Sequence, residues 1–316
     1  MKFSLALPLF FSLILCNIAA AADYKWNETQ GKSLALKDGD KVIWQFNYAA
    51  EESKPYFHPV ALADGPVLTA DAPPDHPWHK SLWFSWKLIN GVNYWEYDSR
   101  TGKPGGVTGV DSTEITKNDD GTVTIVQQIT YKPSDGDPVM KETRTVKVSA
   151  PDENGEYHFD WTCKFTPLVD VVLDRTPLPG EPGGQTYGGY AGLSIRLTQS
   201  LEEAEIASTE GPVEFAKDQR HRSKADAFDY SGIVDDKPVG FAVCDHPDNV
   251  NSPSPWYTIN TPGIGFYYIN AAVLCYGKLE RKADESFTLR YRVIAHHDRW
   301  NSQKLQTQYE QFVKQP

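Results

Sequence analysis

Polar and apolar residues alternate along much of the chain, and this pattern predicts β-strands. Residues 139–149 place lysine, glutamate and arginine between valine, threonine and methionine. Residues 157–165 alternate in the same way, with aromatic side chains and Cys163 opposite polar ones. Because successive side chains of a strand point to opposite faces, each run fits a strand with one buried face. Further β-rich runs lie at residues 33–36, 42–48, 81–87, 92–97, 112–116, 122–131, 191–197, 239–244, 265–269 and 286–295.

Turn residues separate these runs. Gly39, Gly91 and Gly121 each follow Asp or Asn between two runs, which is typical of antiparallel hairpins. The tail has helical spacing, with Asn301 or Ser302 as the cap, and we expect this helix to close an edge or end of the β-structure. The apolar residues at spacings of four and three are Leu305, Tyr309 and Phe312. Many strands without alternating helices predict an all-β fold. We expect a large antiparallel β-sandwich with a short C-terminal helix, in a single domain over residues 23–316.

The first 22 residues differ from the rest and read as a secretory signal peptide. Lys2 precedes an apolar run at residues 5–18, and alanines at residues 19–22 offer cleavage sites. We therefore expect a periplasmic or secreted protein without a membrane span. Because residues 1–22 contain Lys2 and no acidic residue, their removal changes the formal net charge from −11 to −12. Such an acidic protein is a poor candidate for binding nucleic acid or anionic membranes.

Aromatic residues are abundant, with 9 tryptophans and 16 tyrosines. Such side chains pack in cores, but in an apolar pocket they also stack on the apolar faces of sugar rings. This content favours a small-molecule or oligosaccharide partner. After residue 22 the chain keeps Cys163, Cys244 and Cys275, an odd number that allows at most one internal disulfide.

Residues 72–86, APPDHPWHKSLWFSW, hold the densest cluster of candidate chemistry. The prolines impose an extended approach to Asp75, His76 and His79. Side chains three apart on a strand face opposite ways, so the two histidines meet only if the chain bends at Pro77. A carboxylate beside an imidazole orients it and raises its basicity, which suits acid–base catalysis by His76 and His79 with Asp75 as partner. Asp-His-Pro is also good turn chemistry, so a structural role is the alternative.

Other residues have types that suit the same site. Arg196 is a charge on an otherwise apolar strand, so we expect it to bind a carboxylate or a substrate oxygen, unless it faces solvent. A second Asp-His-Pro string starts at Asp245, and the Pro- and Gly-rich segment 167–189 is a candidate functional or mobile loop. For aromatic candidates, core packing is the commoner fate. The residues predicted to contact substrate are His58, Trp83, Asp245, His246, Trp256 and Tyr257.

Motifs of several other enzyme classes do not occur in the sequence. It contains no Gly-x-Ser-x-Gly nucleophile elbow, no Gly-x-x-x-x-Gly-Lys phosphate loop and no His-Glu-x-x-His metal motif. The histidines still leave a zinc, copper or iron site open, because neutral imidazole binds all three. We expect no obligatory cofactor, with a bound metal ion as the alternative.

Six strings of the chain resemble the bacterial family labelled PmoA-like. They are PYFHPV, PPDHPWHKSLWFSW, NGVNYWE, GGYAGLSIRL, DYSG and FAVCDHPDNVNSPSPWY, and the resemblance as a whole covers roughly residues 41–296. Where many members carry His-His-Arg-Gly, this chain has Trp78-His79-Lys80-Ser81, which weakens any role that needs histidine at position 78 or arginine at position 80. The strings that recur in the family contain seven of the candidate residues of this chain, which are Asp75, His76, His79, His58, Arg196, Asp245 and His246.

The resemblance implies a β-sandwich of the galactose-mutarotase-like, supersandwich kind. Members are often encoded near sugar oxidoreductases and sugar-phosphate isomerase-like proteins. The label is shared with a helical membrane subunit of methane monooxygenase, which this strand-rich chain does not match. Residues and resemblance together predict an exported carbohydrate-active enzyme of lyase, hydrolase or epimerase type, with histidines in a concave β-sheet cleft. The alternatives are a non-catalytic sugar-binding module and a histidine metal site, with copper as the metal that the label implies.

Overall fold

The strands of this protein form two large sheets and one small sheet, and every strand runs antiparallel to its paired neighbours. The computed structural model describes residues 24–314, so the predicted signal peptide at residues 1–22 lies outside the described residues. The first sheet has the order β1 (Tyr24–Thr29), β2 (Ser33–Asp38), β3 (Lys41–Asn47), β4 (Tyr56–Val60), β5 (Leu82–Ser85), β13 (Gly192–Arg196), β20 (Phe266–Ala272), β19 (Pro255–Thr261) and β16 (Arg220–Lys224).

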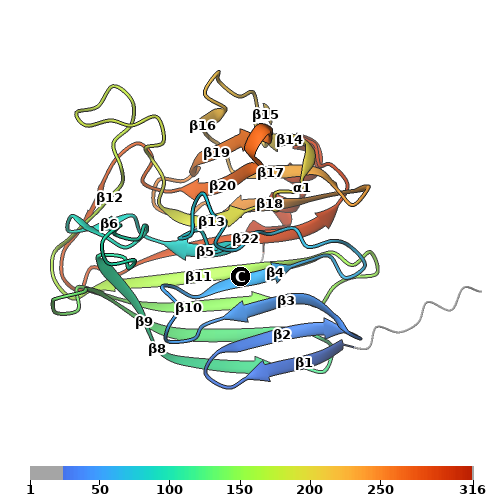
Figure 1. Cartoon of the computed structure of the whole chain (residues 1–316), viewed down its shortest axis with the longest axis horizontal. Coiled ribbons are helices and arrows are strands. Elements are labelled where there is room, and N and C mark those ends of the chain that lie inside the picture. Colours follow the sequence, from blue (N-terminus) through green and yellow to red (C-terminus); the bar gives the residue numbers. More distant parts are fainter. Residues whose placement is uncertain (1–23, 315–316) are drawn as a thin grey trace, which may run out of the picture.

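The second sheet also has nine strands and lies behind the first (Figure 1). Its order is β15 (Gly211–Pro212), β14 (Glu202–Ser208), β17 (Ala227–Val234), β18 (Lys237–Asp245), β22 (Phe287–His297), β11 (Tyr157–Pro167), β10 (Met140–Val148), β9 (Val123–Pro133) and β8 (Gly106–Lys117). The small sheet has the order β21 (Leu279–Arg281), β12 (Val171–Asp174), β6 (Leu88–Ile89) and β7 (Val92–Asn93). A short 3-10 helix, η1 (Pro262–Ile264), joins β19 to β20.

The main hydrophobic core lies between the two large sheets. Phe57 of β4 packs edge-on against Phe159 and Trp161 of β11, with ring centroids 4.8 and 5.8 Å apart. These three side chains are almost fully buried. Alternation along β11 supplies this face, because Phe159, Trp161 and Cys163 point inward while the residues between them are more exposed. The predicted all-β antiparallel sandwich is therefore confirmed.

The C-terminal helix α1 (Ser302–Val313) covers a face of the second sheet, not an edge or end as expected from the sequence. The side chain of Asn301 caps it by accepting a hydrogen bond from the backbone of Lys304 at 2.9 Å. Its buried residues Leu305 and Phe312 join a small cluster of apolar residues on the outer faces of β17, β18 and β22. The side chains at these outward positions are apolar, and the helix shields them from solvent.

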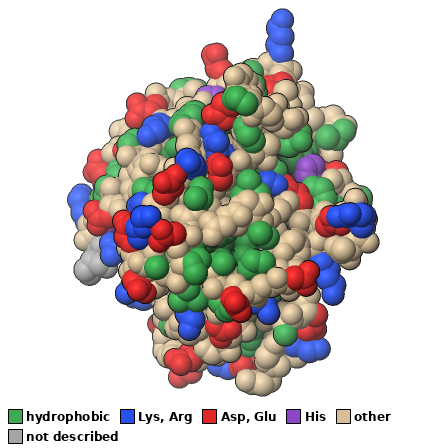
Figure 2. All heavy atoms as spheres, turned by 90° about the vertical axis from the view of Figure 1, so that its left-hand side faces the viewer, with side chains coloured by type: hydrophobic (Ala, Val, Ile, Leu, Met, Phe, Trp, Pro, Cys, Tyr) green, Lys and Arg blue, Asp and Glu red, His purple; other side chains and the backbone are tan. Residues whose placement is uncertain are grey.

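The hairpin at Gly91 forms, but it belongs to the small sheet. The run predicted at residues 81–87 is a strand only over Leu82–Ser85. The hydroxyl of Ser85 donates to the backbone carbonyls of Trp86 and Tyr94, both at 3.2 Å, where the chain leaves the first sheet. The side of the molecule that carries β6 and β12 shows hydrophobic side chains near its centre, surrounded by intermixed acidic and basic ones (Figure 2).

Candidate functional site

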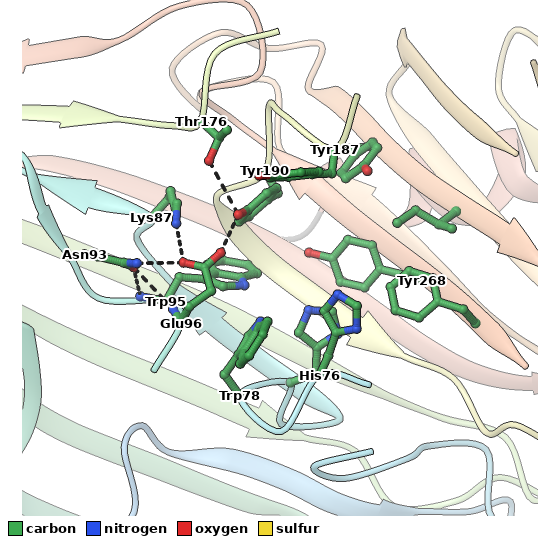
Figure 3. Close-up of a pocket in the computed structure, with 14 residues that line it drawn as sticks. His76, Trp78, Lys87, Asn93, Trp95, Glu96, Thr176, Tyr187, Tyr190 and Tyr268 are labelled. Carbon is green, nitrogen blue, oxygen red and sulfur yellow. Dashed lines mark hydrogen bonds and ion pairs between the residues drawn. The ribbon is translucent and has the colours of Figure 1, made fainter. Parts of the chain in front are cut away.

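A pocket of about 400 Å³ opens on the face of the first sheet that points away from the main core. Strand alternation creates this face: in β20, Tyr267 and Ile269 point into the core, whereas Phe266 and Tyr268 point into the pocket. Loops from three other parts of the chain complete the walls. The lining residues are His76, Trp78, His79, Lys87, Asn93, Trp95, Glu96, Thr176, Tyr187, Tyr190, Tyr257, Ile259, Phe266 and Tyr268 (Figure 3).

The two histidines meet because the chain turns twice between β4 and β5. The backbone N–H of His76 donates to Pro73 O, and that of His79 donates to His76 O, both at 2.9 Å. These turns bring the imidazole rings to a centroid distance of 4.7 Å. The bend that the sequence required at Pro77 is therefore present. His79 is almost fully buried and stacks on Tyr268 at 5.2 Å, whereas His76 is about one-third exposed at the pocket wall.

A chain of charged groups leads from the sheet to His76. Oδ2 of Asp75 accepts hydrogen bonds from Nη2 of Arg196 and from Nδ1 of His76, each at 2.9 Å. Burial would raise the pKa of Asp75, but the His76 hydrogen bond and the Arg196 charge outweigh it, so the pKa lies below its ordinary value. An ionised carboxylate only accepts hydrogen bonds, so Nδ1 of His76 carries the proton. Nε2 then has a free lone pair and, within residues 24–314, no hydrogen-bond partner.

The protonation states of both histidines favour the neutral form. Burial lowers the pKa of His76 below its usual 6.5, and Asp75 only partly offsets this effect. Burial, followed by the nearby charges of His76 and Arg196, lowers the pKa of His79 well below 6.5. At neutral pH His76 is therefore a neutral base with its lone pair available, as proton abstraction requires.

Glu96 lies across the pocket from His76 and was not predicted (Figure 3). Its carboxylate accepts hydrogen bonds from Lys87, from Nδ2 of Asn93 at 2.8 Å and from the Tyr190 hydroxyl. Burial would raise its pKa, but the Lys87 charge and the three hydrogen bonds outweigh burial, so the pKa lies below its ordinary value. Glu96 is therefore an ionised acceptor, held rigidly by its partners.

The Pro- and Gly-rich loop between β12 and β13 forms one wall through Thr176, Tyr187 and Tyr190. Two arginines hold it in place. Nη2 of Arg175 donates to both carboxylate oxygens of Glu181, at 2.7 and 2.9 Å. Nη2 of Arg222 donates to the backbone carbonyls of Thr186 at 2.6 Å and Gly188 at 2.8 Å. The segment expected to be functional or mobile thus lines the pocket. It is held by an ion pair within the loop and by the contacts of Arg222 near its C-terminal end.

The predicted residues fall into two groups. His76, His79 and Tyr257 line the pocket, and Asp75 and Arg196 lie directly behind His76. Trp83 faces the same side but is covered, with its ring 5.1 Å from His79. These six residues are brought together as the sequence led us to expect.

The remaining four predicted contacts lie elsewhere. His58 does not line the pocket, and its Nδ1 pairs with Thr69 Oγ1 at 3.0 Å. Trp256 points into the main core and stacks on Phe228 at 4.8 Å, because it alternates with Tyr257 on β19. Asp245 ends β18 of the second sheet, and His246 packs against Phe312 of α1 at 5.5 Å. The structure therefore does not place Asp245, His246, Trp256 or His58 in this pocket.

The sequence also raised the questions of a metal site, a disulfide and a membrane span. Across residues 24–314, no group of three or more His, Cys, Asp or Glu side chains is arranged to hold a metal ion. The three cysteines of this range are free and buried. No helix among the same residues is long and apolar enough to cross a membrane.

Comparison with solved structures finds weak similarity to carbohydrate enzymes. An α-galactosidase from Lactobacillus brevis is 9% identical with a TM-score of 0.44, over 87% of this chain and 40% of that one. A related α-galactosidase from Geobacillus stearothermophilus is 10% identical with a TM-score of 0.45, over 87% of this chain and 41% of its own. The present chain thus spans about two-fifths of these enzymes.

A shorter structure and a family model complete the comparisons. A galactose mutarotase related enzyme from Lactobacillus acidophilus is 8% identical with a TM-score of 0.42, over 86% of this chain and 97% of that one. No curated protein matches the chain. The model of a family of unknown function, DUF6807, matches residues 33–310. The chain belongs to this DUF6807 family.

Proposed function

We propose that the pocket binds a sugar and performs acid–base chemistry on it, with His76 as the base. The observation that carries this proposal is the line Arg196–Asp75–His76, which ends in a basic nitrogen at an aromatic pocket opposite Glu96. A buried arginine fixes the carboxylate, the carboxylate fixes the imidazole, and the imidazole faces the cavity. Such a fixed base fits proton transfer, which contributes about 10²–10⁴-fold to rates.

A sugar fits the two-sided lining of the pocket. Phe266, Tyr268 and Tyr257 offer apolar ring faces from β19 and β20. Asn93 and Glu96 offer hydrogen-bonding groups from the opposite side (Figure 3). A sugar ring likewise has apolar C–H faces and a rim of hydroxyls, and a volume of about 400 Å³ is at the small end for ligand pockets. We therefore propose one or two sugar rings as the ligand.

The proposed reaction starts with proton transfer to Nε2 of His76. That nitrogen takes a proton from a C–H or O–H bond of the sugar, and the electron pair of this bond forms a new C=C or C=O bond. The C–O bond at the carbon that accepts this pair breaks at the same time, and its own electron pair leaves with the oxygen. The departing oxygen receives a proton from a nearby donor, for which the ammonium of Lys87 is placed. Asp75 stabilises the imidazolium that forms. His79, deeply buried and neutral, holds the ring of His76 by direct packing.

The pocket favours lyase or epimerase chemistry over hydrolysis by two carboxylates. Among the described residues that line it, Glu96 is the single carboxylate. Most glycosidases place two carboxyl groups on either side of the bond that they cleave. One fixed histidine base and one ionised acceptor fit a reaction that needs proton abstraction and charge stabilisation.

A thermal-shift screen of the protein without residues 1–22 tests this proposal. The panel contains neutral sugars, keto-sugars and uronic acids, followed by divalent metals. A ligand at a hundredfold excess over its Kd stabilises the folded state by about 2.7 kcal/mol. We expect a sugar to raise the Tm of the wild type and of His158→Ala, a control histidine on β11 outside the pocket. His76→Ala should bind without turnover.

Three results of this screen, followed by turnover assays on the sugars that bind, would contradict the proposal. Binding without turnover in the wild type would indicate a non-catalytic sugar-binding module. A response to metal alone, lost in His76→Ala, would indicate a histidine metal site. Full turnover by folded His76→Ala would remove His76 from the mechanism.

We also propose the narrower assignments that the sequence favours. The first assignment is membership of the PmoA-like family, from the resemblance over residues 41–296. The second is export of the protein to the periplasm or the medium. The basis for export is the apolar run after Lys2. Mass spectrometry of the protein from its native cell should show an N-terminus near Ala22, and a retained Met1 would contradict export.

A further inference from the structure

The charges that line the pocket cancel one another. Lys87 and Glu96 are its cation and its anion, and they are paired directly. Both groups are largely buried, with side-chain exposures of 9% and 19%. His76 and His79 also line the pocket, and burial lowers the pKa of each, so both are neutral at pH 7. The remaining lining residues are aromatic, aliphatic or uncharged polar groups.

Further cations lie near the pocket but do not line it. Arg196 stacks on Phe266, with its Cζ 3.7 Å from the ring centroid, and its charge is matched by Asp75. Lys54 is fully buried and donates to the backbone carbonyl of Trp95 at 3.0 Å. Burial lowers the pKa of Lys54 to about 7, so this lysine is only partly charged at neutral pH. Neither Arg196 nor Lys54 adds a free positive charge to the cavity.

Two more arginines lie behind the pocket wall at Tyr257. Nε of Arg220 donates to the Tyr257 hydroxyl at 3.1 Å, and Cζ of Arg222 lies 4.3 Å from the centroid of the same ring. Tyr257 lines the pocket and neither arginine does, so the tyrosine stands between these two charges and the cavity.

We propose that this pocket selects neutral sugars, including keto-sugars, and rejects sugars that carry a carboxylate. This inference rests on the proposed function, because it concerns the same site. A uronate would bring a second negative charge close to Glu96, and the cation beside it is already paired. An ionised carboxylate that loses water without gaining a free cation binds poorly. A neutral sugar meets no such cost, and its hydroxyls can bond the polar wall.

The test compares matched pairs of probes by isothermal titration calorimetry at pH 7. The pairs are D-glucose with D-glucuronate and D-galactose with D-galacturonate, each also as its methyl glycoside. We expect at least one neutral member to bind about tenfold more tightly than its uronate, which equals about 1.4 kcal/mol. Equal or tighter binding of the uronate overturns the proposal.

A charge variant tests the cause of the selectivity. Glu96→Gln removes the anion and frees the Lys87 cation, so the preference for the neutral member should fall by at least about tenfold, which equals about 1.4 kcal/mol. Glu52→Gln is the matched control, because Glu52 pairs with Lys80 at 3.1 Å outside the pocket lining. That control should keep the wild-type preference. An unchanged preference in folded Glu96→Gln contradicts the proposed cause.

The outcomes also separate this inference from the proposed function. If uronates bind and are turned over, the acid–base proposal stands and the neutral selectivity is wrong. If no sugar of either kind binds the wild type, both are wrong. The comparison of each neutral sugar with its uronate uses the wild type only. It therefore decides the selectivity even if the Glu96→Gln variant fails to fold.

Discussion

Replacement of Asp75 by asparagine tests the link between the sheet and the candidate base. Oδ2 of Asp75 accepts hydrogen bonds from Arg196 and His76, both at 2.9 Å. The Arg196 side chain is fully buried, whereas that of Asp75 is 32% exposed. Asp75→Asn keeps the shape of the side chain and removes its charge. The buried guanidinium of Arg196 then loses the carboxylate that neutralises its charge.

The size of the effect follows from this partial burial. Breaking a fully buried ion pair costs about 3–5 kcal/mol, and an exposed pair contributes about 1 kcal/mol or less. Because water screens one end of this pair, we expect Asp75→Asn to lower the free energy of unfolding by about 2 kcal/mol. A loss of that size lowers the Tm of a protein this large by about 4 °C. Urea unfolding at pH 7 measures the free energy directly.

The same variant should change the titration of His76. The hydrogen bond and charge of Asp75 raise the pKa of His76 and oppose the lowering by burial. Without them the pKa should fall further, which NMR of the imidazole C–H signals can follow. Asp248→Asn is the control, because Asp248 lies 3.6 Å from both His246 and Arg290 but is 76% exposed. A surface change of this kind should cost less than about 0.5 kcal/mol. Equal stability losses in the two variants, or a higher His76 pKa in Asp75→Asn, would show that Asp75 does not link Arg196 to His76.

Three further predictions concern the pocket floor, the loop and the thiols. Burial lowers the pKa of His79 well below 6.5, so its contribution to stability should be complete above about pH 6.5 and be lost as the pH falls below that value. The free energy of unfolding of His79→Phe, measured in urea, should therefore depend less steeply on pH than that of the wild type, by up to about 1.4 kcal/mol per unit below pH 6.5, and an unchanged slope would contradict this. Arg222→Ala removes the bonds to Thr186 and Gly188, so chymotrypsin should cut faster at Tyr187 without a change in global unfolding; unaltered cleavage would show that these bonds do not hold the loop. Burial raises the pKa of the three described thiols, Cys163, Cys244 and Cys275. A thiol reagent should therefore label none of them in the folded protein lacking residues 1–22 and all of them in denaturant. Labelling of the folded protein would contradict this prediction.

Local patterns in the sequence predicted the strands well, because alternation is a property of each strand by itself. Residues 157–165 show this, since their inward residues are those that the alternation assigned. Alternation separates the two faces of a strand but does not say which face meets the core. Trp256 and Tyr257 were therefore indistinguishable as candidates, although one lies in the core and the other in the pocket.

Long-range pairing explains the misses in the candidate site. The Asp-His-Pro strings at Asp75 and Asp245 are alike locally, yet the first belongs to the pocket and the second follows a strand of the other large sheet. Glu96 was missed because its partner Tyr190 is 94 residues away in the chain. The available hint was a carboxylate directly after two aromatic residues, in the string NYWE. Such a hint becomes specific only once the fold supplies its neighbours.

The acid–base role of His76 is tested by proton NMR in D₂O, in which the wild type and His76→Ala are each incubated with neutral sugars, keto-sugars and uronic acids. One spectrum follows anomer exchange, deuterium incorporation and bond cleavage together. We expect the wild type to accelerate one of these reactions for at least one sugar, and folded His76→Ala to bind the same sugar but to turn it over about 100-fold or more slowly. Either full turnover by the folded variant, or no turnover of any sugar by the wild type, would contradict this expectation.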